Sequence, residues 1–364
     1  MAALRLHLAT GVGPRLHVAL VEHFGSARVA ADAGARALAD APGIGPDSAR
    51  KIRDALDHAD PEAELRRAQD AGVQLVFRSD PAYPVALTYL PDAPPVLYVK
   101  GDLVPEDAQA MAVVGMRRCS LYGKDQAERL AGGLARVGFT VVSGLARGID
   151  SAAHSGALAA GGRTLAVLGN GLSRVYPPEN RRLADAVAAQ GALVSEFPME
   201  TSPRAENFPR RNRVLAALSL GTIVVEAGRR SGALITARLA GEMGKEVFAV
   251  PNRVDAPGAA GVHALIRDGA KLVESLADIL DEFPDLGLPS PAGETAAEQP
   301  DLALKANLSP EEGRLMKVMD GEPAPIETLA SRAGVEVSAA AGALTLLELK
   351  GLVRALPGGR FVKR

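Results

Sequence analysis

The sequence has a single cysteine, no tryptophan and only 4% aromatic residues. One cysteine, Cys119, cannot close a disulfide within the chain, which excludes a disulfide scaffold and a cysteine-rich zinc site and is typical of a reducing compartment. The six histidines are scattered without the spacing of metal ligands. We therefore expect a cytoplasmic protein that holds no metal ion.

The chain also has no large excess of positive or of negative charge. Lysine and arginine total 41 against 43 aspartate and glutamate residues, a formal net charge of -2, so no global field draws the protein to nucleic acid or to an acidic membrane. Any anion-binding site must therefore be local. The longest uncharged apolar stretch, residues 214–225, is far shorter than the ~20 residues that span a bilayer, and we expect no membrane segment.

The N-terminal part, residues 1–65, contains two similar turns. They are Gly11-Val12-Gly13-Pro14 and Gly43-Ile44-Gly45-Pro46, and the second matches the helix-hairpin-helix pattern, in which backbone N–H groups at a helix start can hold a phosphate. Positive charge nearby comes only from Arg50, Lys51 and Arg53. Two alternatives stay open for this module: contact with nucleic acid, or helix packing alone.

Residues 66–280 form the predicted core domain. After a proline-rich connector over residues 71–101 that ends in a strand, short apolar strands alternate with amphipathic helices. This alternation predicts the α/β class, a parallel sheet with helices on both faces, which binds ligands beyond the carboxyl ends of its strands. The expected strands cover residues 111–115, 139–143, 164–168, 192–195, 222–225 and 246–250. The expected helices cover residues 120–137, 150–160, 179–190, 211–218, 231–243 and 262–267.

The C-terminal part is predicted to be a linker and a small domain. Residues 281–301 contain four prolines and six acidic residues but no basic residue, which predicts a solvated linker. Residues 302–364 predict three helices followed by a hairpin, the pattern of a winged helix. The last of these helices, residues 338–350, has no Arg, Asn or Gln to address base edges. We therefore favour protein contact or structural support for this domain over the alternative, sequence-specific reading of an operator.

Four of the predicted strands end in clusters of glycine and small polar residues, which let a backbone approach an anionic ligand. No cluster is a Walker A loop or a Gly-x-Gly-x-x-Gly fingerprint, and each alone is common turn chemistry. Because all four lie at one edge of the expected sheet, we favour a phosphate-lined site. The clusters are residues 114–117, 143–150, 169–171 and 231–236, and they include Gly115, Arg117, Ser143, Gly144, Leu145, Arg147, Gly148, Ser231 and Gly232.

Asp150 and His154 follow the second of these clusters. Asp150 is placed to cap the helix that begins there, and His154 lies one turn later. We interpret His154 as a residue that supports the loop through a hydrogen bond, because no Ser-His-Asp or Cys-His order accompanies it.

The only strong local charge lies in residues 204–238, which hold seven arginines against two glutamates, a net charge of +5. Within it, Phe208 precedes Arg211, Asn212 and Arg213 at a predicted helix start, a combination suited to phosphates and one stacked base. Arg211 and Arg213 point about 200° apart on a helix, so we expect one to face a ligand and the other to pack or to pair with Glu226. The alternative is a solvated helix end whose arginines pair with their neighbours.

Together these motifs resemble the DprA/Smf family of DNA-processing proteins. The resemblance covers residues 83–251 in order, and the N-terminal module and the winged helix resemble optional flanking domains of that family. At Asn252 the family commonly has glycine; asparagine tolerates a left-handed conformation, so we expect the turn to survive. Besides the clusters above, the matching stretches are Tyr83-Pro84, Pro94-Pro95-Val96-Leu97-Tyr98 with Gly101, Ser120 with Tyr122-Gly123, Tyr176-Pro177 with Asn180, Ser195-Glu196, Phe208-Pro209-Arg210-Arg211-Asn212-Arg213 and Val225-Glu226-Ala227.

The resemblance implies a Rossmann-like core that binds single-stranded DNA, forms a homodimer and contacts the RecA recombinase. It also implies the function that we expect: protection of incoming single strands during natural transformation and help in loading RecA, with no catalysis and no cofactor. The DNA-binding residues that it implies are Gly115, Arg117, Ser143, Gly144, Leu145, Arg147, Gly148, Asn180, Arg181, Phe208, Arg211, Asn212, Arg213, Ser231 and Gly232. Its structural residues at the site are Asp150, His154 and Glu226.

An enzyme on a similar core is the alternative from another class. The cytokinin-activating phosphoribohydrolases carry Pro-Gly-Gly-x-Gly-Thr before a helix that contains a glutamate. Here Ser219-Leu220-Gly221-Thr222 precedes a strand, and Glu226 follows that strand. The motif is therefore incomplete, and we favour the DNA-binding function.

Overall fold

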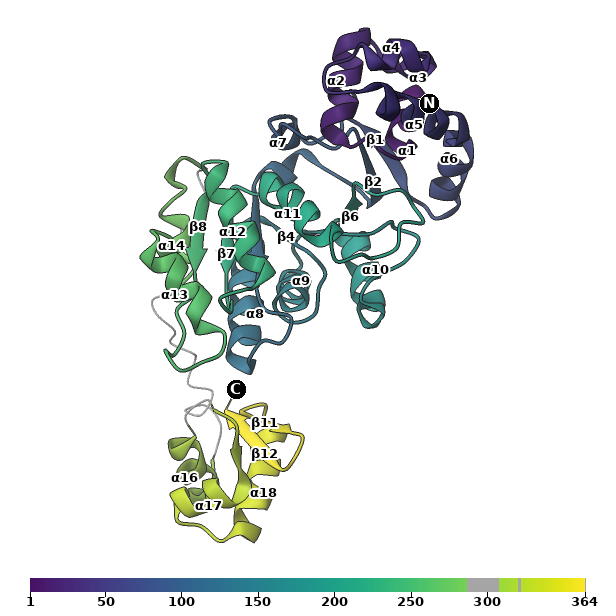
Figure 1. Ribbon diagram of the computed structural model, residues 1–364. Helices are drawn as coiled ribbons and strands as arrows, with labels where there is room; N and C mark the ends of the chain where they lie inside the picture. The colour runs from purple at the N-terminus through teal and green to yellow at the C-terminus, as the bar shows by residue number, and fades with distance from the viewer. Residues whose placement is uncertain (287–307, 320–321, 364) are drawn as a thin grey trace. The chain divides into compact units, whose positions relative to one another are not determined.

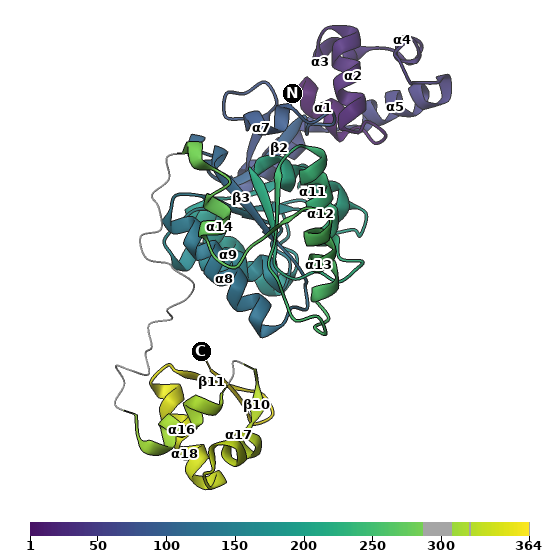
Figure 2. The same cartoon turned by 90° about the vertical axis from the view of Figure 1, so that its left-hand side faces the viewer.

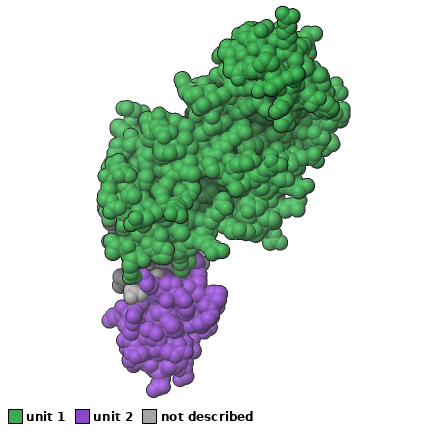
Figure 3. Space-filling view, viewed as in Figure 1, with its two compact units in different colours: residues 1–292 green, residues 293–364 purple. Residues whose placement is uncertain are grey.

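The computed structural model describes residues 1–286, 308–319 and 322–363. The chain divides into two compact units, Met1–Ala292 (unit 1) and Gly293–Arg364 (unit 2), which Figure 3 shows in different colours. Most of the predicted linker, residues 287–301, lies outside the described residues. The first residues of the predicted linker, 281–286, are described and pack on the core. The centre of the Phe283 ring lies 6.2 Å from the centres of both the Phe139 and the Phe248 rings.

Six helices make up the N-terminal part of unit 1. α2 and α5 begin at the prolines of the two similar turns, directly after Gly13 and Gly45, because the first helical position does not use the N–H that proline lacks. Apolar side chains of α1 to α5 form one buried cluster that includes Leu20 and Leu38. The helices are α1 (Ala2–Leu8), α2 (Pro14–Phe24), α3 (Ala27–Asp32), α4 (Ala35–Ala39), α5 (Pro46–His58) and α6 (Pro61–Asp70).

A nine-stranded sheet forms the centre of unit 1 (Figure 1). Its strand order is β1-β2-β6-β5-β4-β3-β7-β8-β9, and all neighbours from β6 to β9 are parallel. β2 pairs antiparallel with both β1 and β6. The strands are β1 (Gln74–Phe77), β2 (Val96–Gly101), β3 (Ala110–Val114), β4 (Thr140–Ser143), β5 (Thr164–Leu168), β6 (Ala192–Ser195), β7 (Gly221–Val224), β8 (Glu246–Ala249) and β9 (Lys271–Leu272).

Helices cover both faces of the sheet. In β5, Leu165 and Val167 join the apolar cluster under one helical layer, whereas Ala166 and Leu168 join the cluster under the other, as the alternation of side chains along a strand requires. Figure 2 shows α8, α9 and α14 on one side of the sheet and α11, α12 and α13 on the other. The predicted α/β class, a Rossmann-like parallel sheet with helices on both faces, is therefore confirmed. The helices of this part are α7 (Val85–Thr88), α8 (Leu121–Arg136), α9 (Ile149–Ala159), α10 (Arg181–Gln190), α11 (Asn207–Leu218), α12 (Gly232–Glu242), α13 (Ala259–Arg267) and α14 (Ala277–Leu280), with short 3-10 turns at Pro105–Ala108, Pro178–Asn180 and Pro284–Leu286.

Some details differ from the sequence predictions, and two of them bear on the sheet and on the site. The sheet is extended by β1 and β9, which the alternation of strands and helices did not predict. α11 begins at Asn207 rather than at residue 211, so that Phe208 and Arg211 both belong to the first turns of a helix.

The strand order places a crevice at one edge of the sheet. From β3 the chain proceeds through β4, β5 and β6 in one direction, and then crosses β3 to continue through β7, β8 and β9 in the other. Ligands of open parallel sheets bind at such a reversal, beyond the carboxyl ends of the strands. In this protein the reversal lies between β3 and β7.

Unit 2 has the winged-helix elements that the sequence predicts, together with a short strand β10 that pairs with β12. A capping box of Ser309 and Glu312 begins the helix Pro310–Val318, and the buried Glu312 pairs with Lys350 at 2.7 Å. Among the described helices of both units, none is long and apolar enough to cross a membrane. The elements are α16 (Pro310–Val318), β10 (Ala324–Pro325), α17 (Ile326–Ala333), α18 (Val337–Leu349), β11 (Val353–Leu356) and β12 (Arg360–Lys363).

Candidate functional site

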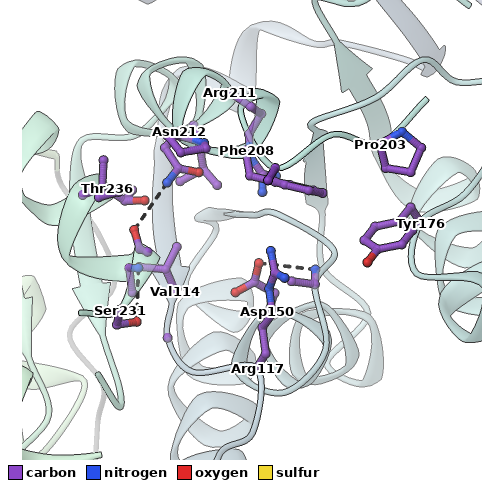
Figure 4. A pocket seen from close by; sticks show the side chains of 18 residues that line it. Val114, Arg117, Asp150, Tyr176, Pro203, Phe208, Arg211, Asn212, Ser231 and Thr236 are labelled. Atoms are coloured by element: carbon purple, nitrogen blue, oxygen red, sulfur yellow. Dashed lines mark hydrogen bonds between the residues drawn. The ribbon is translucent and has the colours of Figure 1, made fainter. Parts of the chain in front are cut away.

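A pocket of about 470 Å³ occupies the crevice at the carboxyl ends of β3 and β7 (Figure 4). Its walls come from the loops after β3, β4, β5 and β6 and from the first turns of α11 and α12. We call it the crevice pocket. The predicted residues that line it are Gly115, Arg117, Asp150, Phe208, Arg211, Asn212, Ser231 and Gly232.

The mouth of the crevice pocket carries a cation over an aromatic ring. The exposed Arg117 places its Cζ atom 5.1 Å from the centre of the Phe208 ring, and the Tyr176 ring lies 5.8 Å from the same ring. Within the described part of the chain, Arg117 has no carboxylate within 4.0 Å. Its charge is therefore available to an anion, and its planar guanidinium and the two rings offer stacking surfaces.

The loop after β4 is held by Asp150 from inside. The Oδ2 atom of Asp150 accepts hydrogen bonds from the N–H groups of Gly144 at 3.1 Å and Ala146 at 3.4 Å, and burial raises the pKa of this carboxyl. Helix α9 is capped by Gly148 instead, whose φ is +75°. The prediction that Asp150 caps the helix is therefore wrong, and two N–H groups of the predicted phosphate nest already have an acceptor.

The glycines around the crevice pocket serve different purposes. A Cβ atom on Gly115 would lie 2.6 Å from Ile149, and one on Gly144 would lie 2.5 Å from the guanidinium of Arg211. Both glycines therefore permit close packing within the protein. A Cβ atom on Gly232 would have no heavy atom within 4 Å, so this glycine at the start of α12 borders open space in the pocket.

The first turn of α12 presents its N-terminus to the crevice pocket. Ser231 caps this helix by accepting a hydrogen bond from the N–H of Ala233 at 3.3 Å. Asn212 of α11 donates to the carbonyl of Gly232 at 3.4 Å and thereby ties the two helix starts together. A helix N-terminus favours an anion, because its free N–H groups and its dipole are both positive.

Arg211 forms part of the base of the crevice pocket. Its side chain is buried and donates a hydrogen bond to the carbonyl of Val167. Burial lowers its pKa to about 10, against the opposing effect of the Asp150 carboxylate. Arg211 therefore faces the pocket as a cation while it also supports the end of β5.

Arg213 points away from the crevice pocket and packs within the protein, which is one of the two alternatives that we expected; among the described residues its carboxylate partners are Glu196 and Asp92 and not Glu226. Its guanidinium is buried and donates to Glu196 at 2.9 Å, and its Nε atom lies 3.0 Å from Asp92. Glu196 also lies 3.5 Å from the half-exposed Arg210. The cluster ties α11 to the end of β6 and to the connector before β2, which makes Arg213 a residue of the fold.

Glu226 has a structural role, but it binds backbone and side-chain groups of other loops and not an arginine of α11. It accepts hydrogen bonds from the N–H of Ser120 at 2.8 Å and from the Asn252 side chain at 3.0 Å. Asn252 is not among the described residues with a positive φ; instead it accepts from the N–H of Arg253 at 2.8 Å. Asn252 therefore does not use the left-handed conformation that we expected it to tolerate there.

The remaining predicted residues surround the loop after β4 and do not line the crevice pocket. The side chains of Ser143 and Leu145 are fully buried, and Ser143 donates to the carbonyl of Val113 at 2.6 Å. Asn180 donates to the carbonyl of Leu145 at 2.8 Å. Arg147 is exposed but pairs with Glu179, and Arg181 is exposed at the start of α10.

His154 is fully buried, and its Nδ1 atom lies 2.7 Å from the Thr164 hydroxyl. That hydroxyl donates to the carbonyl of Val141, so Nδ1 carries the proton. Burial lowers the pKa of His154 to about 3, which keeps the ring neutral. The hydrogen bond joins α9 to the start of β5, rather than to the loop as we predicted.

Several residues of the crevice pocket escaped the sequence analysis as site residues. Ala146 and Thr236 lie within two of the predicted clusters but were not among the predicted site residues. Tyr176 belongs to a stretch that matched the family, whereas Pro203 and Ala205 follow β6, whose end carries no predicted cluster. The signal that could have found them is position, because the loops after β5 and β6 must end at the same edge as the other clusters. These residues are Ala146, Tyr176, Pro203, Ala205 and Thr236.

The comparisons with family descriptions divide the chain into three parts. Residues 74–284 match the family described as DNA recombination-mediator protein A. Residues 296–359 match the DprA winged helix domain, and residues 6–57 match the SAM-like helix-hairpin-helix tandem. The first match contains every residue that lines the crevice pocket.

Individual proteins are similar to this chain over most of its length. Protein Smf of Escherichia coli is 44% identical over 301 residues, which cover 82% of this chain and 79% of that protein. Protein Smf of Synechocystis is 34% identical over 382 residues, which cover 97% and 96%. The structure of DNA processing protein A from Streptococcus pneumoniae is similar with a TM-score of 0.68 and 36% identity, over 77% of this chain and 96% of that one.

A second solved structure is DNA processing protein A from Helicobacter pylori, described for its single-stranded DNA binding mode. It has a TM-score of 0.53 and 30% identity, over 59% of this chain and 97% of that one. The match to DNA recombination-mediator protein A covers more than half of the chain, and the Escherichia coli relative covers more than two thirds. The chain therefore belongs to the DprA/Smf family.

Proposed function

We propose that this protein binds single-stranded DNA in the crevice pocket with little preference for sequence. The observation that carries the proposal is the mouth of the pocket, where the exposed Arg117, which has no carboxylate partner among the described residues, lies over the ring of Phe208. Guanidinium and aromatic planes stack on any base, and a single strand leaves its bases free to stack. The positive start of α12, open at Gly232, suits a backbone phosphate.

The Helicobacter pylori relative supports this proposal, since its structure is described for a single-stranded DNA binding mode. We propose further that the protein acts in DNA processing during natural transformation, protects incoming single strands, loads RecA and forms a homodimer in the cytoplasm. Membership of the DprA/Smf family supports these roles. Of the predicted DNA-binding residues, those that line the crevice pocket are the ones that we propose to contact the strand.

We also propose that the protein is not an enzyme. Asp150, whose carboxylate lines the crevice pocket, is buried, and one of its oxygens already accepts hydrogen bonds from two backbone N–H groups. Because Asp150 is held by the loop in this way, it is a poor general base for the reaction of the alternative function, a nucleotide-hydrolysing enzyme.

The proposed function predicts a salt-dependent preference for single strands. If the protein neutralises about four to six phosphates of the strand, a plot of log affinity against log salt concentration has a slope of about -3 to -4, at ~0.7 per phosphate. Fluorescence anisotropy with labelled single-stranded and duplex oligonucleotides of the same sequence measures both quantities. Equal affinity for the two forms, or an affinity that salt does not change, would overturn the proposal.

A further inference from the structure

Two loops make up one wall of the crevice pocket. Residues 170–177 follow β5 and contribute Tyr176, and residues 196–206 follow β6 and contribute Pro203 and Ala205. The second loop leads directly into α11, which carries Phe208. We call the two loops together the pocket wall.

Hydrogen bonds to backbone carbonyl groups join the two loops of the pocket wall. The carbonyl of Met199 accepts two hydrogen bonds from Ser173, one from the backbone N–H at 3.2 Å and one from Oγ at 2.6 Å. The N–H of Gly171 donates to the carbonyl of Thr201 at 2.9 Å. The position of one loop therefore determines the position of the other.

A carboxylate from outside the pocket wall holds it at Met199. Glu64 of α6 is only 2% exposed, and its Oε1 atom accepts a hydrogen bond from the N–H of Met199 at 2.7 Å. Its other oxygen accepts from Arg67 at 2.9 and 3.1 Å. Both oxygens are therefore used, one for the wall and one for the cation that balances the buried charge.

Helix α6 is packed on the core, although it lies between the two matched regions of residues 6–57 and 74–284. Ala68 is fully buried in the apolar cluster that also contains Met199. The helix is therefore a rigid base from which Glu64 can fix a distant loop.

We propose that Glu64 is a positioning residue of the DNA site, which sets the pocket wall through the N–H of Met199. This inference rests on the proposed binding of single-stranded DNA. A buried N–H that loses its acceptor must find another or reach water. Either movement shifts the loop that carries Pro203 and Ala205 and the start of α11, and thus changes the pocket without removing any residue that lines it.

Replacement of Glu64 tests the proposal by affinity for a labelled oligodeoxythymidine. Glu64→Ala is expected to bind about tenfold more weakly than the wild type, the effect of one unsatisfied buried group. Glu64→Gln keeps an oxygen for the Met199 N–H and is expected to bind within about threefold of the wild type. Leu38→Ala is the matched control, because it creates a cavity in the separate cluster of α1 to α5 and is expected to bind normally despite a lower melting temperature.

Three outcomes would overturn this role for Glu64. They are normal binding by Glu64→Ala, an equal loss of affinity in Leu38→Ala, and no recovery in Glu64→Gln. If Glu64→Ala does not fold, Glu64→Asp replaces it in the test, because the aspartate side chain is one methylene too short to reach the Met199 N–H. The Glu64→Asp protein must then bind the oligonucleotide more weakly than the wild type. A wild-type protein that binds no oligonucleotide would instead contradict the proposed function itself.

Discussion

Replacing Arg213 by alanine is expected to lower the free energy of unfolding of unit 1 by about 3–5 kcal/mol. The buried guanidinium bonds to Glu196 at 2.9 Å and lies 3.0 Å from Asp92. Without it, the one cation that the described part of the chain leaves within 4.0 Å of Glu196, which is 4% exposed, is Arg210 at 3.5 Å. A buried carboxylate without a close partner is the costly state, because its desolvation is no longer offset.

Urea unfolding followed by tyrosine fluorescence measures this loss. All five tyrosines lie between Tyr83 and Tyr176, so the signal reports unit 1 alone. Arg238→Ala is the control, since Arg238 and its partner Glu242 are exposed on α12, and we expect a change within about 0.5 kcal/mol. An Arg213→Ala variant as stable as this control would contradict the role of the cluster.

The loss in Arg213→Ala should also shrink as the pH falls from neutral toward 4.5, the ordinary pKa of glutamate. Burial already raises the pKa of Glu196, and Arg213 opposes that rise. Without Arg213 the folded state takes up a proton at a pH at which the unfolded chain does not. Lower pH then favours the folded variant, and the difference from the wild type narrows.

Replacing Phe208 or Arg117 by alanine is expected to weaken the binding of single-stranded DNA in two distinguishable ways. Phe208→Ala removes a stacking surface and should cost about 1–3 kcal/mol of binding free energy, with an unchanged salt slope. Arg117→Ala removes a cation that can meet a phosphate as well as the contact with the Phe208 ring. Its salt slope should become shallower by about 0.7.

Titrations of a labelled single strand at several salt concentrations separate these two signatures. Arg118→Ala is the matched control, because Arg118 is also exposed and adjacent in sequence but does not line the crevice pocket. We expect it to bind nearly as the wild type does. If Arg117→Ala and Phe208→Ala also bind normally while folded, the strand does not occupy the crevice pocket.

The sheet could be predicted because its physical signals are local. The inner parallel strands are short apolar runs such as Met111 to Val114, buried on both faces, and the helices between them bury an apolar side. β1 and β9 could not be predicted from the sequence, because they lie at the edges of the sheet. Gln74 is exposed there, and Lys271 carries a charge and is only partly buried, so the apolar signal is weak.

The candidate site could be located but not completed from the sequence. Glycine and arginine at the strand ends indicated the edge, because parallel strands bring their carboxyl ends together. The role of each arginine could not be predicted. Whether Arg211 or Arg213 faces the crevice pocket depends on Glu196 and Asp92, whose positions only the folded chain reveals.

Photo-crosslinking tests the central claim, the place of the single strand, most directly. A single-stranded oligonucleotide that contains 5-iodouracil is irradiated in complex with the full chain, and the modified peptides are mapped by mass spectrometry. We expect crosslinks at Tyr176 or Phe208, the rings at the mouth of the crevice pocket. Crosslinks confined to residues 1–65 or to residues 308–363 would contradict it.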